Sequence, residues 1–536
     1  MKRYIRKNCS AFAWAAVCVL IGTVFATILQ FFKGDVLDYA VAGNTYEAIR
    51  YALLLIGFIL LEVLFYYLFS RLSARFHVSC VRGLKADLFC GILGRSFTQF
   101  KSMQHGEYIA KYANDAQLIG EMHFSMLPML VQILGKVLMV AAALFWLDWR
   151  IALVTIFLLT MPLYVPKLIE KRLQRAQKDY IAAVEKNLAM VTDILSGFEI
   201  VKNFSIERSV MSRFAETNCY TAARDLHRKQ LGNLGNLITT LMSYLSYFIV
   251  LAFAAFLVLR GDFSAGDFFV AVGMIDQLSY PIISLSGIIR QLVSIRPACH
   301  DMEDFIASSK GCALGSHCGK LNDGIRFDKA CFSYDGEEPL IRDFSLVIKK
   351  GGRYLIKGPS GCGKTTAVNL LLRYHDLQSG RITIDGEPIG SFCDTYPLIT
   401  VVRQEPVLFR DTLRNNLTMY QEIPDARLIG LLNSLGLSKY ANADALDAMV
   451  AEGGANLSGG EKKRLCLARA LMRDTEVLIL DEPFNGLDKG MAERMRDVLV
   501  DEKRKGKTIL LASHNEHDID YICDRIYEID GGRIIK

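Results

Sequence analysis

Six long apolar segments occupy the first 295 residues, and they constrain the fold of this chain more than any other feature. The segments lie at residues 11–32, 50–70, 127–147, 151–168, 236–260 and 266–290. Most of them are long enough for a helix to cross a hydrocarbon core about 30 Å thick. The segment at 151–168 is marginal by itself, and we expect its helix to continue beyond the bilayer. The pattern predicts an α-helical transmembrane domain with six spans in residues 1–305.

The connections between these segments differ in length and in charge. The N-terminus and the long connections after the second and fourth segments are rich in Lys and Arg, whereas the other connections are short. Because basic loops stay on the cytoplasmic side of a membrane, we expect the N-terminus, both long connections and the C-terminal half in the cytoplasm. Each long connection has the pattern of helices that extend past the bilayer and bend back. A short transverse helix is predicted in each, at 97–101 and at 197–204.

Three charged residues, Glu62, Lys136 and Asp276, lie inside the apolar segments. Charges at this depth are costly and usually face the interior of a helix bundle or a wet cavity. Two interpretations stay open: the three side chains line a substrate pathway, or they pair with each other or lie near a helix end.

The composition fits a membrane protein and argues against one class of partner. Hydrophobic residues make up 51% of the chain, and a net charge of +6 is small for 536 residues, which argues against nucleic-acid binding. The thirteen cysteines follow no disulfide-like pattern, as expected in a reducing cytosol. After a linker at 306–324, the spacing of apolar residues changes to that of strands. We therefore expect a second domain at 325–536.

The second domain contains the sequence GPSGCGKT at 358–365, which fits the pattern G-x-x-x-x-G-K-[ST]. A strand pattern precedes it and a helix pattern follows, as a phosphate-binding loop requires. Its glycines allow backbone N–H groups to close around an anion, and the helix N-terminus adds positive partial charge. We expect Lys364 to reach the β- and γ-phosphates of a nucleotide and the Thr365 hydroxyl to bind Mg²⁺. The residues expected to line the nucleotide are Gly358, Ser360, Gly361, Cys362, Gly363, Lys364, Thr365 and Thr366.

Two carboxylates follow a run of four aliphatic residues at 477–480. The run fits a parallel strand that is buried on both faces. Asp481 is placed to hold Mg²⁺, and Glu482, one residue on, is placed to act as general base on the attacking water. The alternative, a capped strand end with two surface acids, is weakened by the phosphate loop in the same domain.

A second turn suited to anions, Leu-Ser-Gly-Gly-Glu at 457–461, opens a helix pattern that runs to residue 472. Backbone N–H groups at such a turn can hold a phosphate. Because one domain does not need two phosphate-binding turns for one nucleotide, we expect Ser458, Gly459 and Gly460 to serve the ATP of a partner domain. The alternative is a simple N-terminal cap of the helix.

Three further residues are candidates by their position. Gln404 and His514 each follow a strand pattern, so that Gln404 can contact Mg²⁺ or water and His514 can contact the γ-phosphate. Tyr334, ahead of the phosphate loop, can stack on adenine. None of these three residues would indicate a nucleotide site by itself, and the interpretation depends on the other motifs in the same domain.

Together these pieces resemble an ABC transporter half of the exporter type, in which the membrane domain precedes the ATPase domain. LSGGE at 457–461 resembles the family signature, QEPVLF at 404–409 resembles the Q-loop region, and SGFEIVKNF at 196–204 is similar to the second coupling-helix region. The resemblance covers nearly the whole chain. It implies that the second domain is an α/β P-loop NTPase domain, an ABC ATPase with a helical subdomain. It also implies two ATP molecules, with Mg²⁺, held head-to-tail between two such domains.

The resemblance also implies a role for each matching residue. Asp481 and Glu482 match the Walker B pair, and Asp488 matches the D-loop aspartate. The catalytic residues that it implies are Glu482, His514 and Gln404. The implied metal ligands are Thr365, Gln404 and Asp481. The implied nucleotide contacts are Tyr334, the phosphate loop, Ser458, Gly459, Gly460 and Asp488.

Three positions depart from the family pattern. Glu461 stands where Gln is usual, Asn485 stands where exporters usually have Ser, and Gly453 stands where exporters often have Arg. These departures leave room for a heterodimer with a distinct partner chain. No catalytic residue is missing from this half, which argues against an obligatory asymmetry.

We expect ATP-driven transport of a small amphipathic, lipid-like or peptide substrate by a dimer of half-transporters, with export favoured over import. Uptake of a metal–siderophore complex through the same fold stays open, and so does a nucleotide-gated regulator or channel, although Glu482 argues against a gate that works by binding alone. The expected partners are a second half-transporter, identical or distinct, and membrane lipid, with no nucleic acid. The expected location is the bacterial cytoplasmic (inner) membrane.

Overall fold

The structure, a computed structural model, describes residues 1–160, 165–308, 320–334, 338–392, 394–513 and 523–535. These residues form two compact units. The helical unit consists of Met1–Cys90 and His105–Ile306, and the α/β unit consists of Gly91–Gln104 and Ala307–Lys536. Most of the predicted linker, 309–319, lies outside the described residues.

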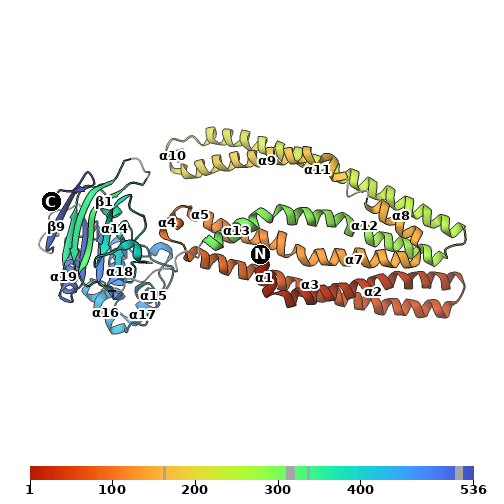
Figure 1. Cartoon of the computed structure of the whole chain (residues 1–536), viewed down its shortest axis with the longest axis horizontal. Helices are drawn as coiled ribbons and strands as arrows, with labels where there is room; N and C mark the ends of the chain where they lie inside the picture. Colours follow the sequence, from red (N-terminus) through yellow and green to blue (C-terminus); the bar gives the residue numbers. More distant parts are fainter. Residues whose placement is uncertain (161–164, 309–319, 335–337, 393, 514–522, 536) are drawn as a thin grey trace. The chain divides into compact units, whose positions relative to one another are not determined.

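The first part of the chain is helical from end to end, apart from short turns (Figure 1). Its principal helices are α2 (Cys9–Val41), α3 (Thr45–Leu93), α7 (Met126–Leu147), α8 (Trp149–Thr160), α9 (Val165–Ser196), α11 (Glu207–Leu259) and α12 (Ala265–Ser294). The shorter helices are α1 (Lys2–Lys7), α5 (His105–Ala110), α6 (Ala116–Ile119), α10 (Phe198–Asn203) and α13 (Arg296–Ser308). Two π-helical turns, η1 (Lys111–Asp115) and η2 (Gly120–Phe124), flank α6.

Four helical stretches in the described part of the chain are long and apolar enough to cross a membrane. They are Cys9–Val41, Thr45–Leu93, His105–Leu147 and Glu207–Leu259, and Trp149–Leu158 is a shorter apolar helix. All six predicted apolar segments fall in helical stretches, with residues 161–164 of the fourth outside the described residues. The six-span count itself stays a prediction.

Two sets of helices pack side by side in this unit. Helix α12 packs against α2 and α7, and α11 runs beside α9 (Figure 1). Where α2 and α12 cross, a Cβ atom on Gly34 would lie 2.9 Å from the carbonyl oxygen of Gly266, so only glycine permits this approach. Asp38 fixes the crossing, because its carboxylate accepts hydrogen bonds from the Ser264 hydroxyl and the Gly266 N–H, each at 2.6 Å.

The three charged residues of the apolar segments differ in exposure. Glu62 on α3 and Lys136 on α7 are half-buried, whereas Asp276 on α12 is exposed. The two interpretations of these charges stay predictions.

The α/β unit contains two sheets. A four-stranded antiparallel sheet has the order β2-β1-β4-β5, and a six-stranded sheet has the order β10-β9-β3-β8-β7-β6, in which all neighbours except β10 and β9 run parallel. The strands are β1 (Gly324–Phe332), β2 (Ile341–Lys349), β3 (Arg353–Lys357), β4 (Ser379–Ile384), β5 (Glu387–Pro388), β6 (Ile399–Val402), β7 (Val477–Asp481), β8 (Thr508–Ser513), β9 (Arg525–Asp530) and β10 (Arg533–Ile534).

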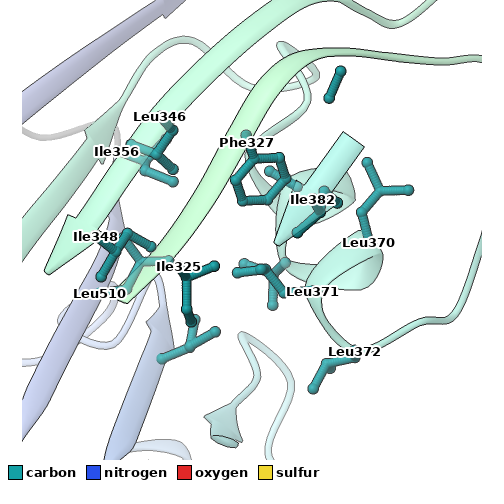
Figure 2. Close-up of a cluster of buried hydrophobic side chains, with 14 of the residues drawn as sticks. Ile325, Phe327, Leu346, Ile348, Ile356, Leu370, Leu371, Leu372, Ile382 and Leu510 are labelled. Carbon is teal, nitrogen blue, oxygen red and sulfur yellow. The ribbon is translucent and has the colours of Figure 1, made fainter. Parts of the chain in front are cut away.

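Helices of this unit pack around two apolar cores. The helices are α4 (Phe97–Lys101), α14 (Lys364–Leu371), α15 (Leu413–Thr418), α16 (Asp425–Ser434), α17 (Ala443–Leu446), α18 (Gly459–Met472) and α19 (Lys489–Arg504), with 3₁₀ turns η4 (Ile389–Ser391), η5 (Ser438–Tyr440) and η6 (Glu452–Gly454). Figure 2 shows the first core, in which Phe327, Ile382 and Leu371 bring together the antiparallel sheet and α14. In the second core, the five helices α15, α16, α17, α18 and α19 pack against the other face of the parallel sheet.

The two predicted short helices are present as α4 and α10, and their transverse orientation stays a prediction. Ser96 and Gln99 form a capping box at the start of α4, which explains why so short a helix begins there. Helix α4 belongs to the α/β unit: the Phe97 ring stacks on Tyr374 with centroids 3.5 Å apart, and the Thr98 hydroxyl donates to the Tyr374 carbonyl at 2.5 Å.

Candidate nucleotide site

The glycine-rich loop connects β3 to α14, as predicted from the sequence. Gly361 and Gly363 have φ of +82° and +106°, a backbone region that side chains other than glycine enter only with strain. The loop folds around Lys364, which is buried, and its Nζ donates to the carbonyl oxygens of Gly358 at 2.7 Å and Pro359 at 2.9 Å. Cys362 is buried beside this ammonium group. The loop therefore holds a cation at its centre, next to the N-terminus of α14.

Thr365 on α14 and Asp481 at the end of β7 meet beside this loop. The Thr365 hydroxyl donates to Oδ2 of Asp481 at 3.0 Å. Every residue of β7 is buried, and Asp481 is only 3% exposed. Burial raises the pKa of the Asp481 carboxyl, against the opposing effects of the Thr365 hydroxyl and the Arg403 charge. A buried carboxylate beside a hydroxyl is a pair of hard oxygen donors, and these residues fit Mg²⁺.

Glu482 follows directly and has an unusual backbone conformation. Its φ is +49°, a region that costs energy for a side chain of this kind and that is enriched at functional sites. The amide of Gln404 donates to its Oε2 at 2.9 Å, and the amide of Asn485 donates to the same oxygen at 3.4 Å. Two amides therefore orient a single carboxylate at the edge of the sheet.

The turn at Ser458 begins α18 with a capping box. Glu461 N–H donates to the Ser458 hydroxyl at 3.3 Å, and Ser458 N–H donates to the Glu461 carboxylate at 2.8 Å. Lys439 on η5 forms an ion pair with the other oxygen of that carboxylate at 2.5 Å. Burial alone would raise the pKa of Glu461, but the hydrogen bonds from Lys439 and Ser458 lower it to about 2. Arg464, one helical turn further along α18, also contacts this turn, since its Nε donates to the Gly460 carbonyl at 3.2 Å.

The remaining predicted residues have separate places. The Tyr334 ring is 54% exposed, and its hydroxyl lies 3.1 Å from the Thr366 hydroxyl, next to the phosphate loop. Asp488 caps α19, because its carboxylate accepts from the Met491 N–H at 2.9 Å. His514 lies outside the described residues.

The structure thus gathers most of the predicted residues into two groups. The loop residues, Tyr334, Gln404, Asp481 and Glu482 lie along the carboxyl ends of the parallel strands β3, β6 and β7 and the end of β1. The hydrogen bonds of Ser458 and Gly460 run instead to Glu461 and Arg464, within the helical part of the unit.

Sequence reasoning missed three residues of these groups. Asn485 departs from the family pattern, but its hydrogen bond to Glu482 follows only from the turn after β7. Arg403 precedes Gln404, and its guanidinium lies 5.5 Å from the Tyr374 ring and donates to Asn369 at 2.8 Å. Lys439 belongs to no motif, and no sequence signal connects it with Glu461.

The sequence was compared with known families and proteins. The family described as ABC transporter transmembrane region matches residues 12–282, and the family described as ABC transporter matches residues 341–485. A Streptococcus pneumoniae serotype 4 protein named as the ABC transporter ATP-binding protein exp8 is 25% identical over 97% of this chain and 90% of its own length. A Burkholderia pseudomallei protein named ATP-dependent lipid A-core flippase is 29% identical over 73% of this chain and 67% of its own length.

The fold matches a solved structure over nearly its whole length. A bacterial Atm1-family ABC exporter with ATP bound superposes with a TM-score of 0.82, at 22% identity, over 99% of this chain and 95% of that one. The transmembrane match alone spans half of the chain, and the second match follows it along the sequence. This chain therefore belongs to the ABC transporters and has the fold of an ABC exporter: it is an integral membrane protein that binds ATP and couples ATP hydrolysis to transport.

Proposed function

We propose that this chain is a half-transporter that works as a pair, in which each ATP lies between the phosphate loop of one copy and the Ser458–Gly460 turn of the other. The observation that supports this pairing is that one ATPase unit holds two turns suited to a phosphate, the loop around Lys364 and the capped N-terminus of α18. One domain does not need two such turns for one nucleotide. A second copy supplies the missing turn for each nucleotide, and all the catalytic motifs are present in this chain.

In this proposal the nucleotide is bound by the loop at 358–366. Lys364 contacts the β- and γ-phosphates, the N–H groups of the loop and of α14 hold their oxygens, and the exposed Tyr334 ring stacks on adenine. Thr365, Asp481 and Gln404 are the ligands for Mg²⁺, which in such sites neutralises charge on the phosphate oxygens. On the partner's side, Ser458, Gly459 and Gly460 contact the γ-phosphate and Asp488 lies at the same interface.

Hydrolysis in this proposal depends on the carboxylate that follows β7. Glu482 accepts a proton from the attacking water, while Gln404 and Asn485 hold its Oε2 in a fixed orientation. Lys364 stabilises the charge that develops on the transferred phosphoryl group. His514 is proposed to contact the γ-phosphate, as the family resemblance implies.

The transport reaction we propose is export of a small amphipathic, lipid-like or peptide substrate. The apolar helices of residues 1–305 form the pathway, the linker is 306–324, and the ATPase domain is 325–536. Relatives of the chain that are named lipid A-core flippases support a lipid-like substrate. The basic N-terminus and long connections support a cytoplasmic location for the ATPase domain, in a bacterial inner membrane.

The test uses Glu482→Gln in the full-length chain reconstituted in lipid. We expect ATP turnover to fall by at least about a hundredfold while ATP still binds, because the general base is lost and the phosphate loop is intact. The measurements are phosphate release and binding of a fluorescent ATP analogue. Normal turnover in this variant would show that Glu482 is not the base.

A further inference from the structure

The Lys439–Glu461 ion pair lies at the first turn of α18, beside the Ser458–Gly460 turn. Both oxygens of the Glu461 carboxylate are engaged: one accepts from the Ser458 N–H at 2.8 Å, and the other lies 2.5 Å from Nζ of Lys439. The two residues are 22 positions apart and come from different elements, η5 and α18. The pair is therefore a tertiary contact and does not arise from helix spacing.

The position of Lys439 is fixed by the packing of its neighbours. Leu437 is buried, and Tyr440 packs against the second core, so the short turn η5 is anchored on both sides of Lys439. The ammonium lies 4.6 Å from the centroid of the Tyr440 ring, which restricts its conformation further. Lys439 is 62% exposed, whereas the Glu461 carboxylate is 15% exposed.

The Glu461 carboxylate opposes the binding of an anion at the turn. The N-terminus of a helix carries about half a positive charge, which is what makes it suitable for phosphate. An unpaired carboxylate in that first turn cancels this charge and repels a triphosphate. A glutamine could accept the same hydrogen bond from Ser458 without a charge, so the hydrogen bond does not require Glu461 to be ionised.

We propose that Lys439 is a positioning residue for ATP hydrolysis: it neutralises Glu461 so that the Ser458–Gly460 turn keeps its attraction for the triphosphate held by the partner. The capping box then holds the turn, and the Ser458 hydroxyl, which accepts from Glu461 N–H, keeps its own proton for a phosphate oxygen. This inference rests on the proposed function, because the triphosphate belongs to the partner copy.

The test measures KM and kcat for MgATP in the full-length chain in lipid. We expect Lys439→Gln to raise KM about fivefold and to change kcat by less than about twofold. The variant leaves the Glu461 carboxylate unpaired, and one such charge near the surface weakens the binding of a triphosphate by about this factor. Lys439→Arg should restore KM. The double variant Lys439→Gln with Glu461→Gln should also restore it, because both charges are removed together.

Two further variants show whether the change in KM is specific to the turn. Lys505→Gln is the control for loss of an exposed lysine elsewhere in the chain, since Lys505 is 69% exposed and forms a 2.6 Å ion pair with Glu502 on α19, a carboxylate that also pairs with Lys507 at 3.5 Å. This control should leave KM unchanged. Ser458→Ala should lower ATPase activity whether or not Lys439 is also replaced. If it does not, the proposed sharing of ATP between two copies is wrong, and the role of Lys439 at that turn is wrong with it.

The inference is overturned by either of two results in a protein that responds to Ser458→Ala. One is an unchanged KM in Lys439→Gln. The other is a double variant whose KM stays as high as that of Lys439→Gln, because loss of a structural contact is not repaired by removal of its second partner.

Discussion

The amide of Gln404 lies 2.9 Å from the carboxylate of Glu482, although 78 residues separate them in the chain. Gln404 follows β6 and Glu482 follows β7, and these strands pair in parallel with Val402 opposite Leu480. Parallel strands end at the same edge of a sheet, so the two side chains meet there. Gln404, which is predicted to contact Mg²⁺ or water, therefore holds Glu482, which is predicted to activate the attacking water.

Gln404→Ala should reduce kcat about ten- to hundredfold, because a base that is displaced by even 1 Å loses much of its effect. The KM for MgATP should change less than kcat, since Thr365 and Asp481 stay in place for Mg²⁺ and the phosphate loop keeps its contacts. Steady-state ATPase assays of the full-length chain measure both. An unchanged kcat would show that the hydrogen bond does not serve catalysis.

Gly363→Ala should weaken ATP binding by about 1–3 kcal/mol, which is the cost of a side chain in a strained backbone region. The φ of Gly363 is +106°, and an added Cβ would approach Ile341 to 3.3 Å. Gly390→Ala is the control, since Gly390 has no atom within 4 Å of such a Cβ. Titration with a fluorescent nucleotide compares the two. Equal affinities in both variants would contradict the strain argument.

Asp385→Asn should destabilise the ATPase unit at neutral pH by about 1–2 kcal/mol, because charged hydrogen bonds become neutral ones. Its carboxylate accepts from the N–H groups of Asn322 and Asp323 at 2.7 Å and of Gly324 at 2.9 Å. Burial would raise the pKa of Asp385, but these three donors outweigh it and hold that pKa below its usual range.

The pH dependence of this effect has a definite sign. A carboxyl whose pKa is lower in the folded state stabilises the fold above its unfolded pKa, which is about 3.9, and the contribution is lost as pH falls below that value. Denaturant unfolding should therefore show a large difference between Asp385→Asn and the unchanged chain at pH 7 and a smaller one toward pH 3. The same difference at both pH values would rule out the carboxylate as the cause.

Much of the ATPase fold could be predicted from the sequence because its motifs are local. The strands before GPSGCGKT and before Asp481 and the helix after Ser458 appear in the structure within a few residues of their expected positions. The short helix at Phe97 was also predictable, since its capping residues, Ser96 and Gln99, are only three positions apart in the chain. Binary patterns and capping signals act over a few residues, and that is the range over which a single sequence is informative.

Contacts between distant segments could not be predicted. The Lys439–Glu461 pair depends on how η5 packs against α18. The close crossing of Gly34 and Gly266 likewise requires two helices to be placed first. Such contacts depend on tertiary packing, and the spacing of residues in a single sequence does not predict which distant residues will meet.

The central claim is that each ATP is shared between two copies, and mixed dimers test it most directly. One chain carries Lys364→Ala and the other carries Ser458→Ala, each with a different affinity tag, so that only the mixed dimer survives two purification steps. Dimers of either variant alone should be inactive. The mixed dimer has one site with both defects and one site with none, so it should hydrolyse ATP at about half the normal rate if the sites act independently. A mixed dimer as inactive as its two parents would contradict the shared site.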